Sequence, residues 1–335
     1  MDSRWMTLDE ALLRLSRTGP ERDGFLSNHA PMAVEVLTRY GHGDLAGHWI
    51  DDYRDRLAEA PRGIAPIPAD QWRDPLGDPT RAGDWITFFE REVALAPWRD
   101  VLATWWPRLL PGIAAGATHG VIRVGHAVRA LLDQETAVRV GELGQGLAYW
   151  AARWQPLAPA GRGPYGGGDP RAALDAVPRV PDQRFGIRNR LAQLADLPGW
   201  PQTAGSVPGD LPGIVAAAVR RHAAFGYGNP VMLVHAATAP AAVLRTLPAL
   251  PVALHRPSIA AAWAASTAVT AAYSPAGPAR VEPAVLDPAD VIQQAVDSGD
   301  PHAIKFADAA VEAYARDADP DLLVASRRAT ELIGA

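Results

Sequence analysis

One lysine stands out among the side chains that could do chemistry. Of the 32 basic residues, Lys305 is the only lysine, and all the others are arginine. The high Ala, Arg, Gly and Pro content indicates a GC-rich gene, which explains the missing lysines but not the one that remains. Because arginine cannot act as a neutral amine, a Schiff-base former or a carbamate, Lys305 is a candidate for chemistry that only lysine supports.

Lys305 follows His302 by about one helical turn. Asp300 is a good N-cap and Pro301 a good first helical residue, so the pair is expected on one face near a helix N-terminus. The positive end of a helix disfavours an ammonium and favours an anion such as a lysine carbamate. The alternative is that Lys305 reaches solvent and His302 caps the helix.

Four further histidines lie in apolar or helix-entrance segments, where neutral imidazole suits a transition metal. His119 and His126 are about 10 Å apart along a helix, so we expect one to bind metal and the other to support it or contact substrate. His235 lies on an apolar helix and His29 at the start of one. The alternative for each is an ordinary hydrogen-bonded histidine. The remaining histidines are interpreted as surface or structural residues: His42, His48, His222 and His255.

Several catalytic classes are excluded by what the sequence lacks. Without cysteine there are no disulfides, thiolate metal sites or cysteine nucleophiles. The chain also lacks G-x-S-x-G, H-E-x-x-H, Glu-x-x-His pairs, and flavin or nicotinamide fingerprints. A metal ion is therefore the simplest carrier of any redox chemistry.

The elements that must position these residues are predicted to be helical almost throughout, which gives an all-α fold. The chain is expected to form a single large helical domain or two helical halves, 1–155 and 183–335, joined by a Pro- and Gly-rich loop over 156–182. The predicted helices near the candidate residues span 113–132, 231–245 and 301–315. Aromatic residues on helices close to His119 are expected in the core, although they would also suit a flat aromatic substrate: Trp98, Trp105, Trp106, Tyr149, Trp150 and Trp154.

Composition limits the surroundings in which the protein works. The net charge of −5 gives no reason to expect nucleic acid or an anionic membrane as a partner. The N-terminal segment carries charges and has no apolar signal core. No segment is expected to span a membrane, the nearest being the weakly apolar stretch 260–272. These features predict a cytoplasmic protein.

Six motifs in order resemble the questin oxidase-like family, from near residue 24 to near residue 315. They are Leu26-Ser27-Asn28-His29-Ala30-Pro31-Met32-Ala33, Pro97-Trp98-Arg99 with Pro111-Gly112, Ala117-Thr118-His119-Gly120-Val121-Ile122-Arg123, Leu147-Ala148-Tyr149-Trp150, His235-Ala236-Ala237-Thr238 and His302-Ala303-Ile304-Lys305-Phe306. The chain departs from the pattern at Arg123, where fungal members carry a second histidine one turn after the first.

The resemblance implies oxidative ring opening of an aromatic polyketide such as an anthraquinone. It further implies a mononuclear non-haem Fe(II), with O2 as co-substrate and a small aromatic substrate as partner. The implied metal ligands are four imidazoles and a carbamate formed from CO2: His29, His119, His235, His302 and Lys305. A requirement for NADPH, the oligomeric state and the true metal are not predicted.

Three more residues are given roles on this hypothesis. His126 and Arg123 are expected to position a phenolate or quinone oxygen, and Asp308, one turn beyond Lys305, to orient that lysine. The reaction is expected to insert oxygen beside a ring carbonyl and then cleave a C–C bond. Two alternatives stay open: a metal-free lyase in which Lys305 forms a Schiff base, and a non-catalytic helical ligand-binding protein.

Overall fold

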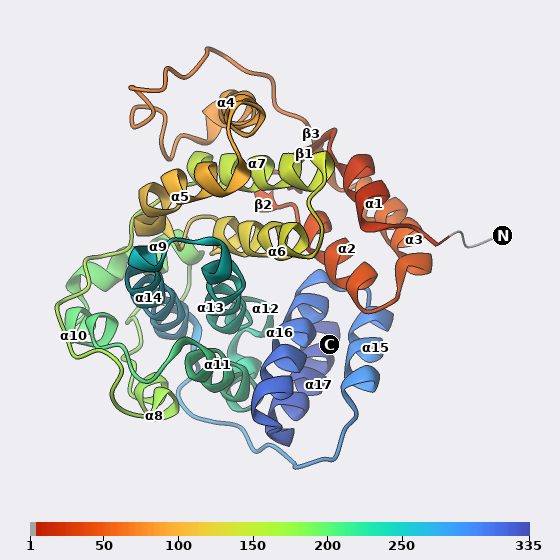
Figure 1. Cartoon of the computed structure of the whole chain (residues 1–335). Coiled ribbons are helices and arrows are strands. Elements are labelled where there is room, and N and C mark those ends of the chain that lie inside the picture. The colour runs from red at the N-terminus through yellow and green to blue at the C-terminus, as the bar shows by residue number, and fades with distance from the viewer. Residues whose placement is uncertain (1–4) are drawn as a thin grey trace. The chain divides into compact units, whose positions relative to one another are not determined.

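The computed structural model describes residues 5–335, and most of them are helical (Figure 1). The predicted all-α class is confirmed. A small three-stranded antiparallel sheet, in the order β2-β1-β3, was not predicted. Its strands are very short: β1 (Thr18–Arg22), β2 (Leu26–Ser27) and β3 (Leu57–Glu59).

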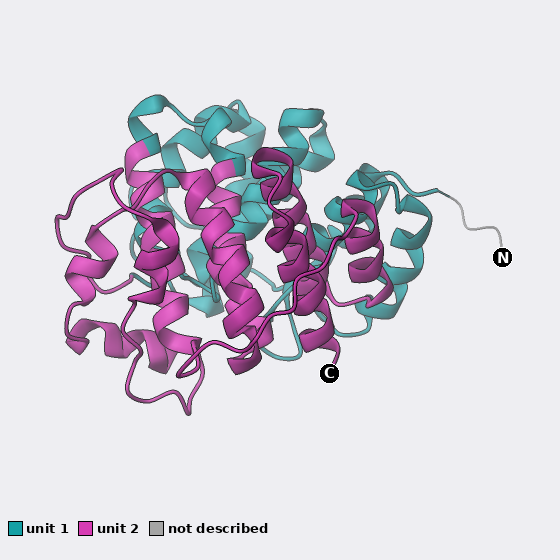
Figure 2. Cartoon of the chain, turned by 90° about the horizontal axis from the view of Figure 1, so that it is seen from below, with its two compact units in different colours: residues 1–156, 245–255 teal, residues 157–244, 256–335 magenta. Residues whose placement is uncertain are grey.

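The chain divides into two compact units, coloured separately in Figure 2. Unit 1 comprises residues 1–156 and 245–255, and unit 2 comprises residues 157–244 and 256–335. The longer helices of unit 1 are α1 (Leu8–Leu15), α2 (Ala30–Arg39), α3 (Gly43–Arg54), α4 (Ala82–Leu95), α5 (Trp98–Leu109), α6 (His119–Asp133) and α7 (Ala137–Ala152). Short 3-10 turns are η1 (Pro79–Arg81), η2 (Leu110–Gly112), η5 (Leu247–Ala249) and η6 (Val252–Leu254).

Local signals explain how unit 1 begins. Thr7 and Glu10 form a capping box at the start of α1. Helices α1, α2 and α3 then share a core that includes Leu12, Val34 and Tyr53. Burial of the apolar side of α2 fixes this helix, and with it the side chains at its start.

Most of the tryptophans near His119 in the sequence are buried in the core of unit 1, in agreement with the simpler of the two interpretations, whereas Trp154 is only partly buried. Trp85 and Trp105 pack edge-to-face with ring centroids 5.9 Å apart, and Phe88 and Phe89 contact both rings. Trp106 packs on Trp150 in the same way at 5.4 Å. Such edge-to-face pairs add about 0.5–1.5 kcal/mol each beyond the burial of their apolar area.

Unit 2 contains α8 (Pro170–Asp175), α9 (Ile187–Ala192), α10 (Trp200–Gly205), α11 (Leu211–Phe225), α12 (Pro230–Leu233), α13 (His235–Thr246), α14 (His255–Tyr273), α15 (Pro288–Asp297), α16 (Pro301–Asp317) and α17 (Pro320–Gly334), together with η3 (Gln193–Asp196) and η4 (Gly226–Gly228). The last residues of α13 and the first of α14 lie in the 245–255 segment of unit 1.

Four helices of unit 2 begin with the same Asp-Pro signal. In α8, α15, α16 and α17, an aspartate side chain accepts a backbone N–H at the N-cap, and a proline follows it. Proline fits this position because its missing N–H would have had no intrahelical partner. The N-cap predicted for Asp300 is thereby confirmed.

Two predicted helices are wrong in places that concern the candidate residues. The helix predicted over 113–132 begins only at His119, because Gly116, Ala117 and Thr118 all adopt left-handed backbone angles. The helix predicted over 231–245 is interrupted at Val234, where α12 ends before α13 begins. The predicted loop over 156–182 also contains the short helix α8.

One described stretch meets the length and composition of a membrane span. It covers Pro230–Ala249, with a mean hydropathy of 1.3, and 72% of its apolar window is buried inside the protein. Such burial is typical of the core helix of a soluble protein.

Candidate metal-binding histidines

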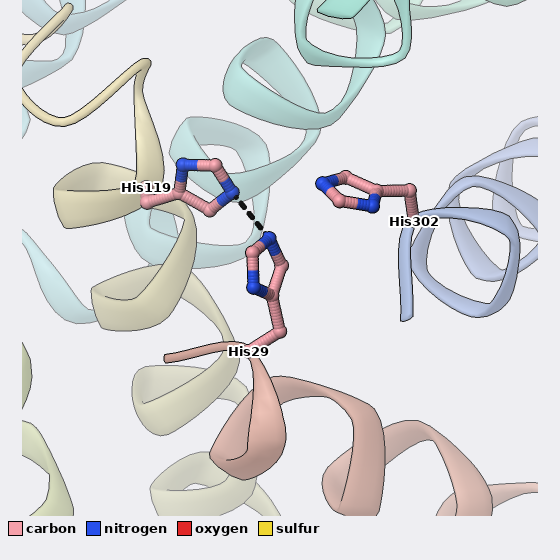
Figure 3. A group of neighbouring side chains, drawn as sticks. All are labelled: His29, His119 and His302. Carbon is pink, nitrogen blue, oxygen red and sulfur yellow. Dashed lines mark hydrogen bonds between the residues drawn. The ribbon is translucent and has the colours of Figure 1, made fainter. Parts of the chain in front are cut away.

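His29 and His119 form a close pair in unit 1. Their Nε2 atoms lie 2.8 Å apart, and the rings stand nearly perpendicular (Figure 3). Two imidazole nitrogens bound at right angles to one ion, each at about 2.1 Å, would be separated by about 3.0 Å. Both histidines are buried, and each stands at the start of a helix, α2 or α6. The pair therefore already has the spacing of two metal ligands.

The other ring nitrogen of each member is held by an oxygen. His119 Nδ1 lies 2.6 Å from the Gly116 carbonyl, which can only accept, so Nδ1 carries the proton and Nε2 the lone pair. Because His119 Nε2 holds the lone pair, His29 Nε2 donates to it, and His29 Nδ1 accepts from the Tyr53 hydroxyl at 3.3 Å. The same hydroxyl accepts the backbone N–H of His29 at 3.2 Å. These contacts fix the plane of both rings.

A left-handed turn aims the Gly116 carbonyl at His119. The φ angles of Gly116, Ala117 and Thr118 are 53°, 57° and 67°. This region costs a non-glycine residue about 1–2 kcal/mol, and such strain concentrates at functional sites. A Cβ on Gly116 would lie 2.6 Å from the Tyr149 hydroxyl, which bonds Ser27 Oγ at 2.5 Å. The close approach of Tyr149 requires glycine here.

Unit 2 carries a second histidine pair. His235 and His302 have ring centroids 5.6 Å apart at an angle of 75°. His235 Nδ1 donates to the Met232 carbonyl at 3.1 Å, a contact made where the helix is interrupted. His302 Nδ1 donates to the Asp300 carboxylate at 3.2 Å. Burial pushes the pKa of Asp300 upward, but hydrogen bonds from the His302 ring and from two backbone N–H groups bring it below its usual value.

Lys305 is buried beside this second pair. Its exposed fraction is 1%, and it lies one turn beyond His302 on α16. Burial, followed by the charges of His302 and Lys305, holds the pKa of His235 well below its usual value. Asp308 is fully buried on the same helix. The alternative in which Lys305 reaches solvent is therefore wrong.

The four predicted ligand histidines share one feature, which His126 also has, although Arg245 contacts its Nε2. Each has Nδ1 within hydrogen-bonding distance of an oxygen, which directs Nε2 to any metal. His222 and His255 are arranged the opposite way, with Nε2 on the carbonyls of Pro230 and Leu250. Buried imidazoles whose Nδ1 atoms are hydrogen-bonded suit a transition metal that prefers nitrogen ligands.

His126 and Arg123 already have buried partners in unit 1. Arg123 forms a two-fold ion pair with Glu142, at 2.6 and 2.9 Å. His126 Nδ1 lies 2.8 Å from Glu35, and its Nε2 lies 3.2 Å from Arg245. Burial, followed by the positive charges of Arg245 and Arg129, lowers the pKa of His126 to about 4 despite the Glu35 carboxylate.

Sequence reasoning missed most of the groups that hold the rings. Glu35 had a weak signal, because it is the one charged residue in the apolar run from Pro31 to Leu37. Tyr53 and Arg245 gave no signal, since their partners lie 24 and 119 residues away. Thr118 is also notable: its fully buried hydroxyl has no hydrogen-bond partner among the described residues.

The amino-acid sequence of this region is similar to a known family. Residues 26–151 match the questin oxidase-like family. The matched segment holds His29, His119 and the residues around both rings, and it supports the family predicted from the six motifs. The questin oxidase-like family implies an oxidoreductase. No curated protein matches the chain.

Proposed function

We propose that this protein is a metal-dependent oxygenase that opens a ring of an aromatic polyketide, such as an anthraquinone. The metal would be a mononuclear non-haem iron with five protein ligands: His29, His119, His235, His302 and carboxylated Lys305. The observation that carries the proposal is the shared arrangement of the four histidines, each with Nδ1 on an oxygen. The questin oxidase-like match over 26–151 supports the reaction class.

The charges of the predicted ligands suit a divalent ion. Lys305 is buried, where an ammonium is costly and a carbamate would instead be compensated by the metal. His119 needs no change of tautomer, since its Nδ1 proton already rests on Gly116. For His29, the ring proton would lie on Nδ1 and be accepted by Tyr53, leaving Nε2 to bind. A ferrous ion would supply the one-electron chemistry that O2 requires.

The reaction balances with O2 and a hydroquinone form of the substrate. The hydroquinone loses two electrons and two protons, one oxygen atom enters a ring C–C bond beside a carbonyl, and the other leaves as water. Hydrolysis of the resulting ester would open the ring. Asp308, fully buried one turn beyond Lys305, is proposed to orient the carbamate. The protein is proposed to act in the cytoplasm.

Labelled oxygen tests this function. Iron-loaded protein would be mixed with a chemically reduced polyhydroxyanthraquinone under ¹⁸O2, and the masses of the products would be measured by mass spectrometry. We expect a ring-opened product that carries one labelled oxygen, and its loss in His119→Ala but not in His222→Gln, a control that keeps the candidate ligands. The proposal would be contradicted if His119→Ala took up as much O2 as the wild type, or if the wild type formed no product.

The burial of Lys305 also suits a second candidate, a Schiff-base lyase, because a desolvated lysine is more readily a neutral nucleophile. Borohydride would then trap a carbonyl substrate on Lys305 in metal-free protein. Stoichiometric iron without trapping would exclude this candidate.

A further inference from the structure

Helices α2 and α6 of unit 1 are joined by two rungs of polar side chains. The upper rung is the His29–His119 pair at the start of both helices. The lower rung is Glu35 with His126, joined through Nδ1 at 2.8 Å. Along α2 the rungs are six residues apart and along α6 seven, which correspond to about 9 and 10 Å. The matched spacing lets the two helices hold both rungs at once.

The lower rung is fixed from both sides. Arg129, one turn beyond His126, binds both carboxylate oxygens of Glu35, one of them at 2.8 Å. Arg245, at the end of α13, donates to His126 Nε2 at 3.2 Å. Because Arg245 can only donate, His126 is neutral with its proton on Nδ1, directed at Glu35. Every polar atom of the His126 ring is therefore in use.

The space beside this rung is too small for a substrate. A cavity of about 10 Å³ adjoins Glu35, Arg123 and His126, which is room for one water molecule. An aromatic ring does not fit there. The Arg123 guanidinium is also paired with Glu142. The contacts favour a role for His126 that operates through its helix.

We propose that the Glu35–His126 rung, locked by Arg129 and Arg245, is a positioning device that sets the separation of His29 and His119. His126 is thus a positioning residue, in place of the substrate contact expected from the sequence. The proposal rests on the proposed metal function only for the purpose of the spacing, which is to bind a metal. The distance between His29 and His119 is itself a property of metal-free unit 1. Breaking the rung lets α2 and α6 shift and moves two ligand atoms apart.

Two readouts test the device. The first is the ¹⁵N spectrum of histidine-labelled, metal-free protein, in which ring shifts report the tautomers and hydrogen bonding of His29 and His119. The second is the dissociation constant for Co²⁺, with its visible spectrum as a measure of ligand geometry. The variants are His126→Leu, the conservative His126→Gln, and Arg245→Gln as a milder lesion should His126→Leu not fold. His222→Leu is the matched control, a buried histidine outside the rung.

The device predicts altered His29 and His119 signals in His126→Leu, and in Arg245→Gln to a smaller extent. It also predicts a Co²⁺ affinity about 10–100-fold weaker, as is typical when a group behind a ligand is removed. His126→Gln should restore both readouts, and His222→Leu should lower stability alone. Unchanged ring signals in His126→Leu and Arg245→Gln would overturn the inference. If the wild type binds no Co²⁺ or iron, the proposed function fails. The spectra of the metal-free protein still test whether the Glu35–His126 rung positions His29 and His119.

Discussion

At the scale of single residues, the environment of a histidine decides whether it can act as a ligand or as a structural group. In His119 and His302 an acceptor oxygen takes the Nδ1 proton, and Nε2 keeps the lone pair that a metal needs. His222 is the structural counterpart: its Nε2 donates to the Pro230 carbonyl at 3.0 Å, and its ring packs on Phe306.

His222 makes stability depend on pH. Burial, aided by the charge of Arg328, lowers its pKa to about 4 although the Pro230 carbonyl opposes the shift. Because the unfolded chain protonates near pH 6.5 and the folded chain only near 4, stability is complete above 6.5 and falls as the pH drops toward 4. The shift corresponds to about 3 kcal/mol at most.

Urea unfolding at pH 7.5 and pH 5 measures this effect. In His222→Gln we expect the difference in free energy of unfolding between the two pH values to shrink by about 2 kcal/mol. An equal pH dependence in wild type and variant would show that His222 is not held neutral.

At the scale of elements, helix starts carry the candidate residues. His29 precedes α2, His119 and His235 begin α6 and α13, and His302 is the second residue of α16. A helix start fixes the backbone at a defined point, and the capping group can also hold a ring. Asp300 does both: it accepts backbone N–H groups of α16 and the His302 ring.

The two functions of Asp300 can be separated with a matched cap. Asp287 caps α15 with the same Asp-Pro signal but contacts no histidine ring among the described residues. Asp300→Ala and Asp287→Ala should each lower the free energy of unfolding by about 1 kcal/mol. Only Asp300→Ala should weaken metal binding, by about 10–100-fold in a Co²⁺ titration. Equal affinities of the two variants would contradict the role of Asp300.

The left-handed turn before α6 gives a second prediction at this scale. Gly116→Ala forces a Cβ against the Tyr149 hydroxyl and should displace the carbonyl that holds His119. Gly166→Ala is the control, since Gly166 has φ +83° but nothing within 4 Å of a Cβ. We expect both to cost about 1 kcal/mol in backbone strain, with a further 1–3 kcal/mol for Gly116→Ala from overpacking. Thermal or urea unfolding measures the difference, and similar losses would mean that Tyr149 moves aside freely.

At the scale of the whole molecule, the sequence predicted elements better than contacts. The start of α16 at Pro301 was predicted to the residue, because the apolar periodicity, the Asp300 N-cap and the proline signal agree there. The start of α6 was missed, since left-handed angles at Ala117 and Thr118 oppose their intrinsic preference. The break before His235 was missed as well, because the run 231–245 is apolar and continuous.

The sequence predicted which residues could belong to the candidate site, but not the contacts that hold their side chains. The solitary Lys305 and the buried histidines came from composition and pattern. The groups that fix the rings could not be predicted, because contacts such as Tyr53 with His29 or Arg245 with His126 join positions far apart in the chain. The interaction of α2 with α6 is likewise a tertiary property, in which Glu35 and His126 only meet once both helices are packed.

The central claim is that Lys305 and the four histidines hold one iron per chain, and metal content tests it most directly. Wild type and Lys305→Arg would be purified anaerobically with bicarbonate present and analysed for iron, with His222→Gln as the folded control. The account predicts close to one iron per chain in wild type and control, and its loss in Lys305→Arg, because arginine forms no carbamate. Equal iron in Lys305→Arg, or no metal in any of the three proteins, would contradict it.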